Sequence, residues 1–174
     1  MILVTQHRKG EPEMNISLHP ITEADLDILF EFENDPIANK MADFPARKRK
    51  AFNAHWQQKI LANEKATAQG IWLDDVLVGN VLSWINTDPA AKSDPQMRLV
   101  GYWIGREYWG QGIATKALEM FLKQFISTPV FAYIDKQNQA SLALAYSNGF
   151  FDVTAQYPKL ISKDNLRLFR RGNV

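Results

Sequence analysis

The chain has 174 residues, of which 46% are hydrophobic, and a formal net charge of +1 from 20 basic and 19 acidic residues. Its length and apolar content predict a single folded domain, and its near-zero charge argues against a surface that neutralises nucleic-acid phosphates. With no cysteine and 3 scattered histidines, the sequence offers no disulfide, no thiol nucleophile and no metal cluster. The apolar start is too short for a signal peptide and no apolar run reaches membrane length, so we expect a cytoplasmic protein without metal, nucleic-acid or membrane partners.

Apolar residues recur at the spacing of strands and helices in alternation along the chain. In order, we expect a strand from Met14, a helix capped by Thr22 that stops near Asp35-Pro36, a helix over 46–63, hairpin strands 66–73 and 76–85, a loop over 87–96, a strand over 99–104, a helix over 113–125, a strand over 130–135, a helix over 138–148 and two strands within 150–170. Strand 76–85 is apolar almost throughout, which is typical of a sheet covered on both faces. We therefore predict an α/β domain over residues 14–174 around a twisted mixed sheet, with residues 1–13 as an appendage.

The most informative segment is residues 101–125, where an apolar strand leads through Gly110-Gln111-Gly112 directly into an amphipathic helix. Glycines at such a turn let the backbone approach a ligand, and the free N–H groups of the first helical turn favour a phosphate. A P-loop does not fit, because Ile113 follows where lysine is required, and Thr115 replaces the last glycine of a dinucleotide fingerprint. A phosphate-binding turn of another kind is indicated, with a plain tight turn as the alternative.

The segment resembles the acyl-CoA-binding motif of the GNAT N-acetyltransferase superfamily, in which an Arg/Gln-x-x-Gly-x-Gly/Ala loop opens the central helix. Its version, GYWIGxxxWGxGIATxAL, is closest to the branch that includes the ribosomal-protein N-terminal alanine/serine acetyltransferases. Asn138, Ser141 and Gly149-Phe150 match the Asn-x-x-Ser…Gly-Phe pattern of that branch. The resemblance implies a mostly antiparallel central sheet with helices on both faces, acetyl-CoA as co-substrate, a primary amine as acceptor, and a monomer or homodimer.

The resemblance also implies which residues hold acetyl-CoA. Backbone N–H groups of the glycine turn would bind the pyrophosphate, while strand residues 102–104 would separate from their neighbour and pair with the pantetheine amides. The implied cofactor-binding residues are Tyr102, Trp103, Ile104, Trp109, Gly110, Gln111, Gly112, Ile113, Ala114, Thr115, Asn138 and Ser141. Ser141 is also the candidate catalytic residue, as a proton donor to the thiolate. The side chains of Tyr102 and Trp103 are expected to be core aromatics, and Asn138 can equally be a helix N-cap.

Two residues depart from the family pattern for proton transfer. Ala145 stands where many GNAT enzymes have a tyrosine acid, and Tyr146 lies about 100° away around the helix. Leu99 stands where a strand carboxylate often serves as base. Other acidic residues expected near the acceptor are Glu31, Glu33, Asp35, Asp88 and Asp94.

Without an assigned base, the acceptor itself has to be partly neutral near pH 7. An α-amino group titrates near pH 7.7–8.0 and a lysine near about 10.4, so an unaided lysine would lose about three log units of rate. The sequence therefore predicts an acetyl-CoA-dependent N-acetyltransferase that acts on a protein N-terminal α-amine or a small-molecule amine. The alternative is a GNAT-fold sensor or interaction protein that binds acyl-CoA without turnover, and a third, a nucleotide-binding domain, would require saturable ATP or NAD binding.

Overall fold

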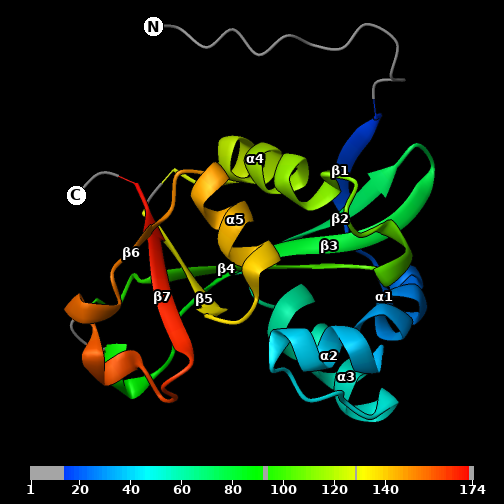
Figure 1. The fold of residues 1–174 in the computed structure, drawn as a ribbon. Helices are drawn as coiled ribbons and strands as arrows, with labels where there is room; N and C mark the ends of the chain where they lie inside the picture. Colours follow the sequence, from blue (N-terminus) through cyan, green and yellow to red (C-terminus); the bar gives the residue numbers. More distant parts are fainter. Residues whose placement is uncertain (1–13, 92–93, 128, 173–174) are drawn as a thin grey trace, which may run out of the picture.

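One seven-stranded mixed sheet forms the centre of the molecule, in the strand order β1-β2-β3-β4-β5-β7-β6 (Figure 1). The structure, a computed structural model, describes residues 14–91, 94–127 and 129–172, so the appendage predicted for residues 1–13 lies outside the described residues. The strands are β1 (Ile16–Pro20), β2 (Thr67–Leu73), β3 (Val76–Ile85), β4 (Arg98–Ile104), β5 (Val130–Asp135), β6 (Phe151–Asp152) and β7 (Leu166–Arg171). The helices are α1 (Leu26–Glu33), α2 (Pro36–Ala42), α3 (Arg49–His55), α4 (Ile113–Phe125) and α5 (Gln139–Ser147).

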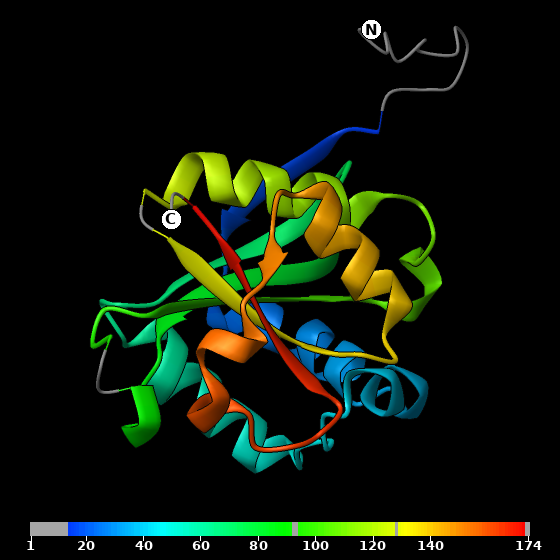
Figure 2. The ribbon, with the colours of Figure 1, turned by 60° about the vertical axis from the view of Figure 1, so that its left-hand side comes forward.

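Helices cover both faces of the sheet, as predicted (Figures 1 and 2). On one face α4 and α5 share a core with the strands, in which Phe121 of α4 and Ala145 of α5 are buried. On the other face, Leu29 of α1 packs with Phe52 and Trp56. The amphipathic helix predicted over 113–125 is confirmed by α4, whose buried residues recur at three- and four-residue spacing.

Strand β4 separates from its parallel neighbour after a short contact. It pairs with antiparallel β3 along its whole length, from Ile85↔Arg98 to Gly79↔Ile104. Its parallel pairing with β5 covers only Arg98↔Val130 and Leu99↔Phe131. From residue 100 onward the β5-facing edge of β4 therefore has no strand partner among the described residues, and its N–H and C=O groups are available to a ligand. This separation is the one expected for residues 102–104.

The region between α1 and β2 differs from the prediction. Asp35-Pro36 was predicted to end a helix, but it also begins α2: Asp35 Oδ1 accepts hydrogen bonds from the N–H groups of Ile37 (2.9 Å) and Ala38 (3.0 Å). The helix predicted over 46–63 begins only at Arg49 and changes to π-helical hydrogen bonding over Trp56–Leu61. A π segment is rare and frequently marks a functional site.

Ion pairs hold α3 against α1: Arg49, the first residue of α3, pairs with Asp27 (2.6 Å) and Glu31 (3.0 Å). The two strands expected within 150–170 are present as β6 and β7, but β6 has only two residues, and the 3-10 turns Thr154–Gln156 and Pro158–Leu160 lie between them.

Candidate active site

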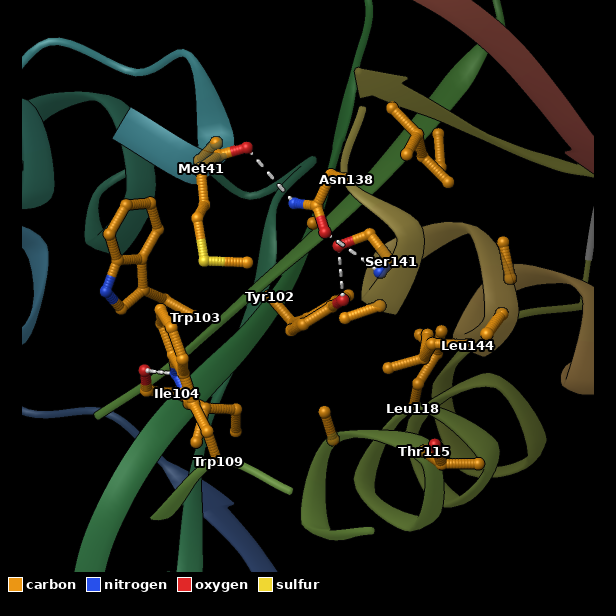
Figure 3. A pocket seen from close by; sticks show the side chains of 18 of the residues that line it. Met41, Tyr102, Trp103, Ile104, Trp109, Thr115, Leu118, Asn138, Ser141 and Leu144 are labelled. Carbon is orange, nitrogen blue, oxygen red and sulfur yellow. Dashed lines mark hydrogen bonds between the residues drawn. The ribbon is translucent and has the colours of Figure 1, made fainter. Parts of the chain in front are cut away.

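A cleft of about 660 Å³ lies where β4 and β5 separate (Figure 3). Its walls come from β4, the glycine turn with the first turns of α4, the end of β5, and α5. Every residue predicted to bind the cofactor lines it: Tyr102, Trp103, Ile104, Trp109, Gly110, Gln111, Gly112, Ile113, Ala114, Thr115, Asn138 and Ser141. The structure thus brings the predicted set together around one cavity.

The glycine turn presents the N-terminus of α4 to this cleft. Gly110 (φ 73°) and Gly112 (φ 77°) adopt left-handed backbone conformations that other residues rarely take. Gly112 is the N-cap of α4 and supplies no side chain, so the first-turn N–H groups from Ile113 onward have no side-chain cap among the described residues. A Cβ atom on Gly110 would meet nothing within 4 Å, which shows that the turn borders open space. Unpaired N–H groups at a helix N-terminus fit the pyrophosphate of CoA.

Asn138, Ser141 and Tyr102 are linked by hydrogen bonds at the other end of the cleft (Figure 3). Asn138 caps α5 by accepting the Ser141 N–H (3.0 Å), while its Nδ2 donates to the Met41 carbonyl of α2 (3.3 Å). The Ser141 Oγ in turn lies 2.8 Å from the hydroxyl of Tyr102, across the gap between α5 and β4. Burial raises the pKa of Tyr102, and the Ser141 hydrogen bond offsets part of this effect.

The Tyr102 hydroxyl is a polar group that the sequence prediction missed. The ring packs against the core, as expected, but the hydroxyl points into the cleft at Ser141. Trp103 also lines the cleft, while its indole Nε1 donates to the Phe32 carbonyl of α1 (2.8 Å). The alternation of residues along a strand predicts the face of the sheet on which a tyrosine lies. It does not predict whether the hydroxyl stays in the core or reaches a helix that packs on that face.

The predicted register of α5 is confirmed. Ala145 is buried and lines the cleft, whereas Tyr146 is 58% exposed and packs edge-on against Phe169, with ring centroids 5.5 Å apart. Tyr146 therefore does not take the place of the family's tyrosine acid.

A second cavity, of about 630 Å³, lies on the opposite face of β4 between the sheet and α1, α3 and the π segment. Gly101, Tyr102 and Trp103 of β4 and Ala42 of α2 line both cavities, so the two meet at the middle of β4. Leu99 lines neither of them: it is 6% exposed and packs in an apolar cluster with Met97 and Phe131. The strand position of the missing carboxylate thus faces the core.

Of the five acidic residues proposed near the acceptor, Glu33 lines the second cavity. Its carboxylate pairs with Arg47 (3.2 Å) and accepts the Trp56 Nε1–H (3.3 Å). Burial raises the pKa of Glu33 and the Arg47 charge opposes that rise. The others have different partners or positions: Glu31 pairs with Arg49, Asp35 caps α2 and pairs with Arg106 (2.7 Å), and Asp88 and Asp94 lie in the loop before β4.

Two residues of the second cavity were not predicted from the sequence. His55 lines it, and burial, with the charges of Arg47 and Lys59, lowers its pKa, so its imidazole is neutral near pH 7. Asn80 of β3 is 1% exposed, and its Nδ2 has no hydrogen-bond partner among the described residues. These residues and Glu33 come from distant segments without a shared motif, so no local signal could have grouped them.

Comparisons with known proteins agree with this geometry. Residues 15–151 match the family of acetyltransferase (GNAT) domains. An aminoglycoside acetyltransferase AAC(6')-Ib crystallised with coenzyme A is similar in structure, with a TM-score of 0.71, 17% sequence identity, and coverage of 91% of this chain and 95% of that one. An acetyltransferase from Thermus thermophilus gives 0.70 and 17%, covering 90% and 96%. A spermidine N-acetyltransferase from Vibrio cholerae, crystallised with CoA and spermine, gives 0.68 and 13%, covering 89% and 92%. A search of the curated proteins found no match.

The chain belongs to the GNAT acetyltransferase family, since the family match covers most of its length. It is an N-acetyltransferase with acetyl-CoA as co-substrate, and the cleft with its exposed helix N-terminus fits that molecule. No helix among the described residues is long and apolar enough to cross a bilayer.

Proposed function

We propose that this enzyme acetylates the α-amine at the N-terminus of a protein or peptide, as in the ribosomal-protein N-terminal acetyltransferase-like branch, with a small-molecule amine as the second candidate acceptor. The observation that carries the proposal is the meeting of two cavities at Gly101–Trp103 of β4. One has the features of a donor site, and the other opens on the opposite face of the strand, where an amine can approach the same point.

On the donor side, backbone N–H groups of residues 111–115 bind the pyrophosphate and the free edge of residues 102–104 pairs with the pantetheine amides. The unpaired edge of β4 and the uncapped start of α4 support these roles. A backbone N–H of this strand polarises the acetyl carbonyl, as an oxyanion-hole donor does. Asn138 holds the start of α5 and the end of α2 at the cleft through its two hydrogen bonds.

Ser141 donates a proton to the thiolate as the bond between sulfur and the acetyl carbon breaks. Its Oγ lies within hydrogen-bond distance of the Tyr102 hydroxyl, which can replace the proton that Ser141 gives up. This pair compensates for Ala145, which carries no hydroxyl at the position of the family's tyrosine. The cleft lining contains both hydroxyls, in support of this role.

The α-amine is favoured over lysine by its acidity. A group that titrates near pH 7.7–8.0 is partly neutral at physiological pH, whereas deprotonating an unaided lysine costs about 4–5 kcal/mol. Leu99 faces the core and Glu33 is paired with Arg47. Among the described residues, no unpaired carboxylate therefore lines the second cavity, which we propose as the acceptor cavity.

The alternative is a protein that binds acyl-CoA without turnover, and the missing tyrosine at Ala145 is the observation that favours it. Thiol release from acetyl-CoA, measured across a panel of peptides and small amines, separates the two. We expect release with at least one α-amine. Thermal stabilisation by CoA without release for any amine would establish the binding protein instead.

A further inference from the structure

The second cavity, the acceptor site proposed above, contains a buried hydrogen-bond donor with no partner in the described part of the chain. Asn80 lines this cavity, is 1% exposed, and has no partner for its Nδ2 among the described residues. It is the cross-strand neighbour of Trp103, so both side chains lie on the face of the sheet that carries the acceptor cavity. Buried polar groups in native proteins are almost always paired, so an unpaired donor at a cavity wall indicates a ligand oxygen.

The charges that line the same cavity favour an acceptor that is not a polycation. Its carboxylate, Glu33, is already neutralised by Arg47 at 3.2 Å. Lys59, also in the lining, has no carboxylate within salt-bridge distance among the described residues. With His55 neutral, the lining carries one more positive than negative charge. A second or third ammonium group on the acceptor would therefore be repelled.

The rest of the wall is largely aromatic. Trp84 and Trp103 rise from the sheet, and Phe44, beneath the Arg47 guanidinium, closes the side near α2. Flat apolar surfaces of this kind accept an apolar side chain.

Resting on the function proposed above, we propose that the acceptor is an α-amino-carbonyl compound with an apolar side chain, either a free amino acid or the first residue of a peptide. Asn80 Nδ2 donates to the carbonyl or carboxylate oxygen next to the amine, and the aromatic walls hold the side chain. Lys59, on the exposed side of the cavity, favours a free carboxylate where one is present. Spermine, bound in the spermidine N-acetyltransferase of similar fold, has no carbonyl oxygen next to its amines and carries the charges that this cavity disfavours.

The test compares acceptors that differ in one feature at saturating acetyl-CoA. The acceptors are phenylalaninamide, phenylalanine, a peptide that begins with phenylalanine, 2-phenylethylamine, which lacks the carbonyl, and spermidine. Each kcat/KM is expressed per concentration of neutral amine, so that differences in amine pKa cancel. We expect phenylalaninamide to exceed 2-phenylethylamine by at least tenfold and spermidine to be the poorest acceptor. Equal values for phenylalaninamide and 2-phenylethylamine would overturn the proposal.

Variants assign the preference to the cavity. Asn80→Leu removes the donor at similar volume and should bring phenylalaninamide down to the level of 2-phenylethylamine, whose own rate stays within twofold. Gln69→Leu is the matched control, because Gln69 is a buried amide on neighbouring β2 that lines neither cavity. A preference that survives Asn80→Leu would refute the role of Asn80. If Asn80→Leu does not fold, Asn80→Asp provides the same test, since its carboxylate repels the carbonyl oxygen and should lower the phenylalaninamide rate most.

Lys59→Glu distinguishes the two sources of the acceptor. It should lower the rate with phenylalanine at least tenfold and leave phenylalaninamide and the peptide within threefold. If phenylalanine is lowered no more than the amide, Lys59 does not recognise the carboxylate, and that part of the proposal is wrong. Faster turnover of spermidine than of phenylalaninamide would overturn the acceptor class and leave the acetyltransferase function standing. If none of the amines causes thiol release from acetyl-CoA, both the acceptor class and the acetyltransferase function are overturned.

Discussion

Replacing Gly112 should separate backbone strain from CoA binding. Gly112 (φ 77°) and Gly149 (φ 77°) share a left-handed conformation, but only Gly112 lines the cleft. An L-residue in that conformation costs roughly 1–2 kcal/mol. For a domain of this size the cost lowers Tm by about 2–4 °C per kcal/mol. A Cβ atom meets nothing closer than 3.9 Å at either site, so strain rather than a clash sets the loss of stability in Gly112→Ala and Gly149→Ala.

CoA affinity should distinguish the two variants. Relief of strain at residue 112 rotates the peptide groups that point the first N–H groups of α4 at the pyrophosphate, whereas residue 149 follows α5 outside the cleft lining. We expect Gly112→Ala to weaken CoA at least tenfold, about 1.4 kcal/mol, and Gly149→Ala to bind it as the wild type does. Thermal unfolding and calorimetric titration with CoA give both quantities. Wild-type affinity in a folded Gly112→Ala protein would refute the pyrophosphate assignment.

Three further substitutions test the site. Tyr146→Phe should keep turnover within about threefold, because the ring packs on Phe169 outside the cleft; a hundredfold loss would mean that Tyr146 is the acid. Ser141→Ala should lower kcat by about 10²-fold and leave CoA affinity within threefold of the wild type. A loss of CoA affinity as large as the loss of kcat, measured in binding and rate assays, would contradict a role in proton transfer. Leu99→Glu should destabilise the fold by several kcal/mol without aiding amines of high pKa, since residue 99 faces an apolar cluster; wild-type Tm would contradict this burial.

The residues that meet around the first cleft could be predicted because their signals are local. Gly112 and the helix that follows it are contiguous, and Asn138 and Ser141 lie within one turn of a single helix, so spacing alone places their backbone groups. The hydroxyl of Tyr102 was missed because its partner Ser141 is 39 residues further along the chain. Residue spacing carries no information about such a contact.

The second cavity could not be predicted for a related reason. Glu33, His55 and Asn80 belong to α1, α3 and β3, and only packing of these elements creates the cavity. Local rules were also ambiguous here. An Asp-Pro pair is compatible with the end of one helix and with the N-cap and first residue of the next, and at Asp35 both occur.

The pH dependence of the rate should show whether the acceptor titrates without help. Burial and the charges of Arg47 and Lys59 lower the pKa of His55 below its ordinary value of 6.5, while Glu33, the carboxylate in the same cavity, is held by Arg47. His55 is thus neutral above about pH 6.5 and cannot add a second ionisation there. With a peptide α-amine, log kcat/KM should rise with unit slope to about pH 8 and then level, and with a lysine-like amine it should rise toward pH 10. Because folded His55 binds protons less readily than in the unfolded chain, stability should fall as pH drops below about 6.5, and His55→Gln should reduce that fall. If the rate with a lysine acceptor levels off near pH 6.5, and the plateau disappears in His55→Gln, then His55 is the base. In that case the acceptor amine does not need a low pKa.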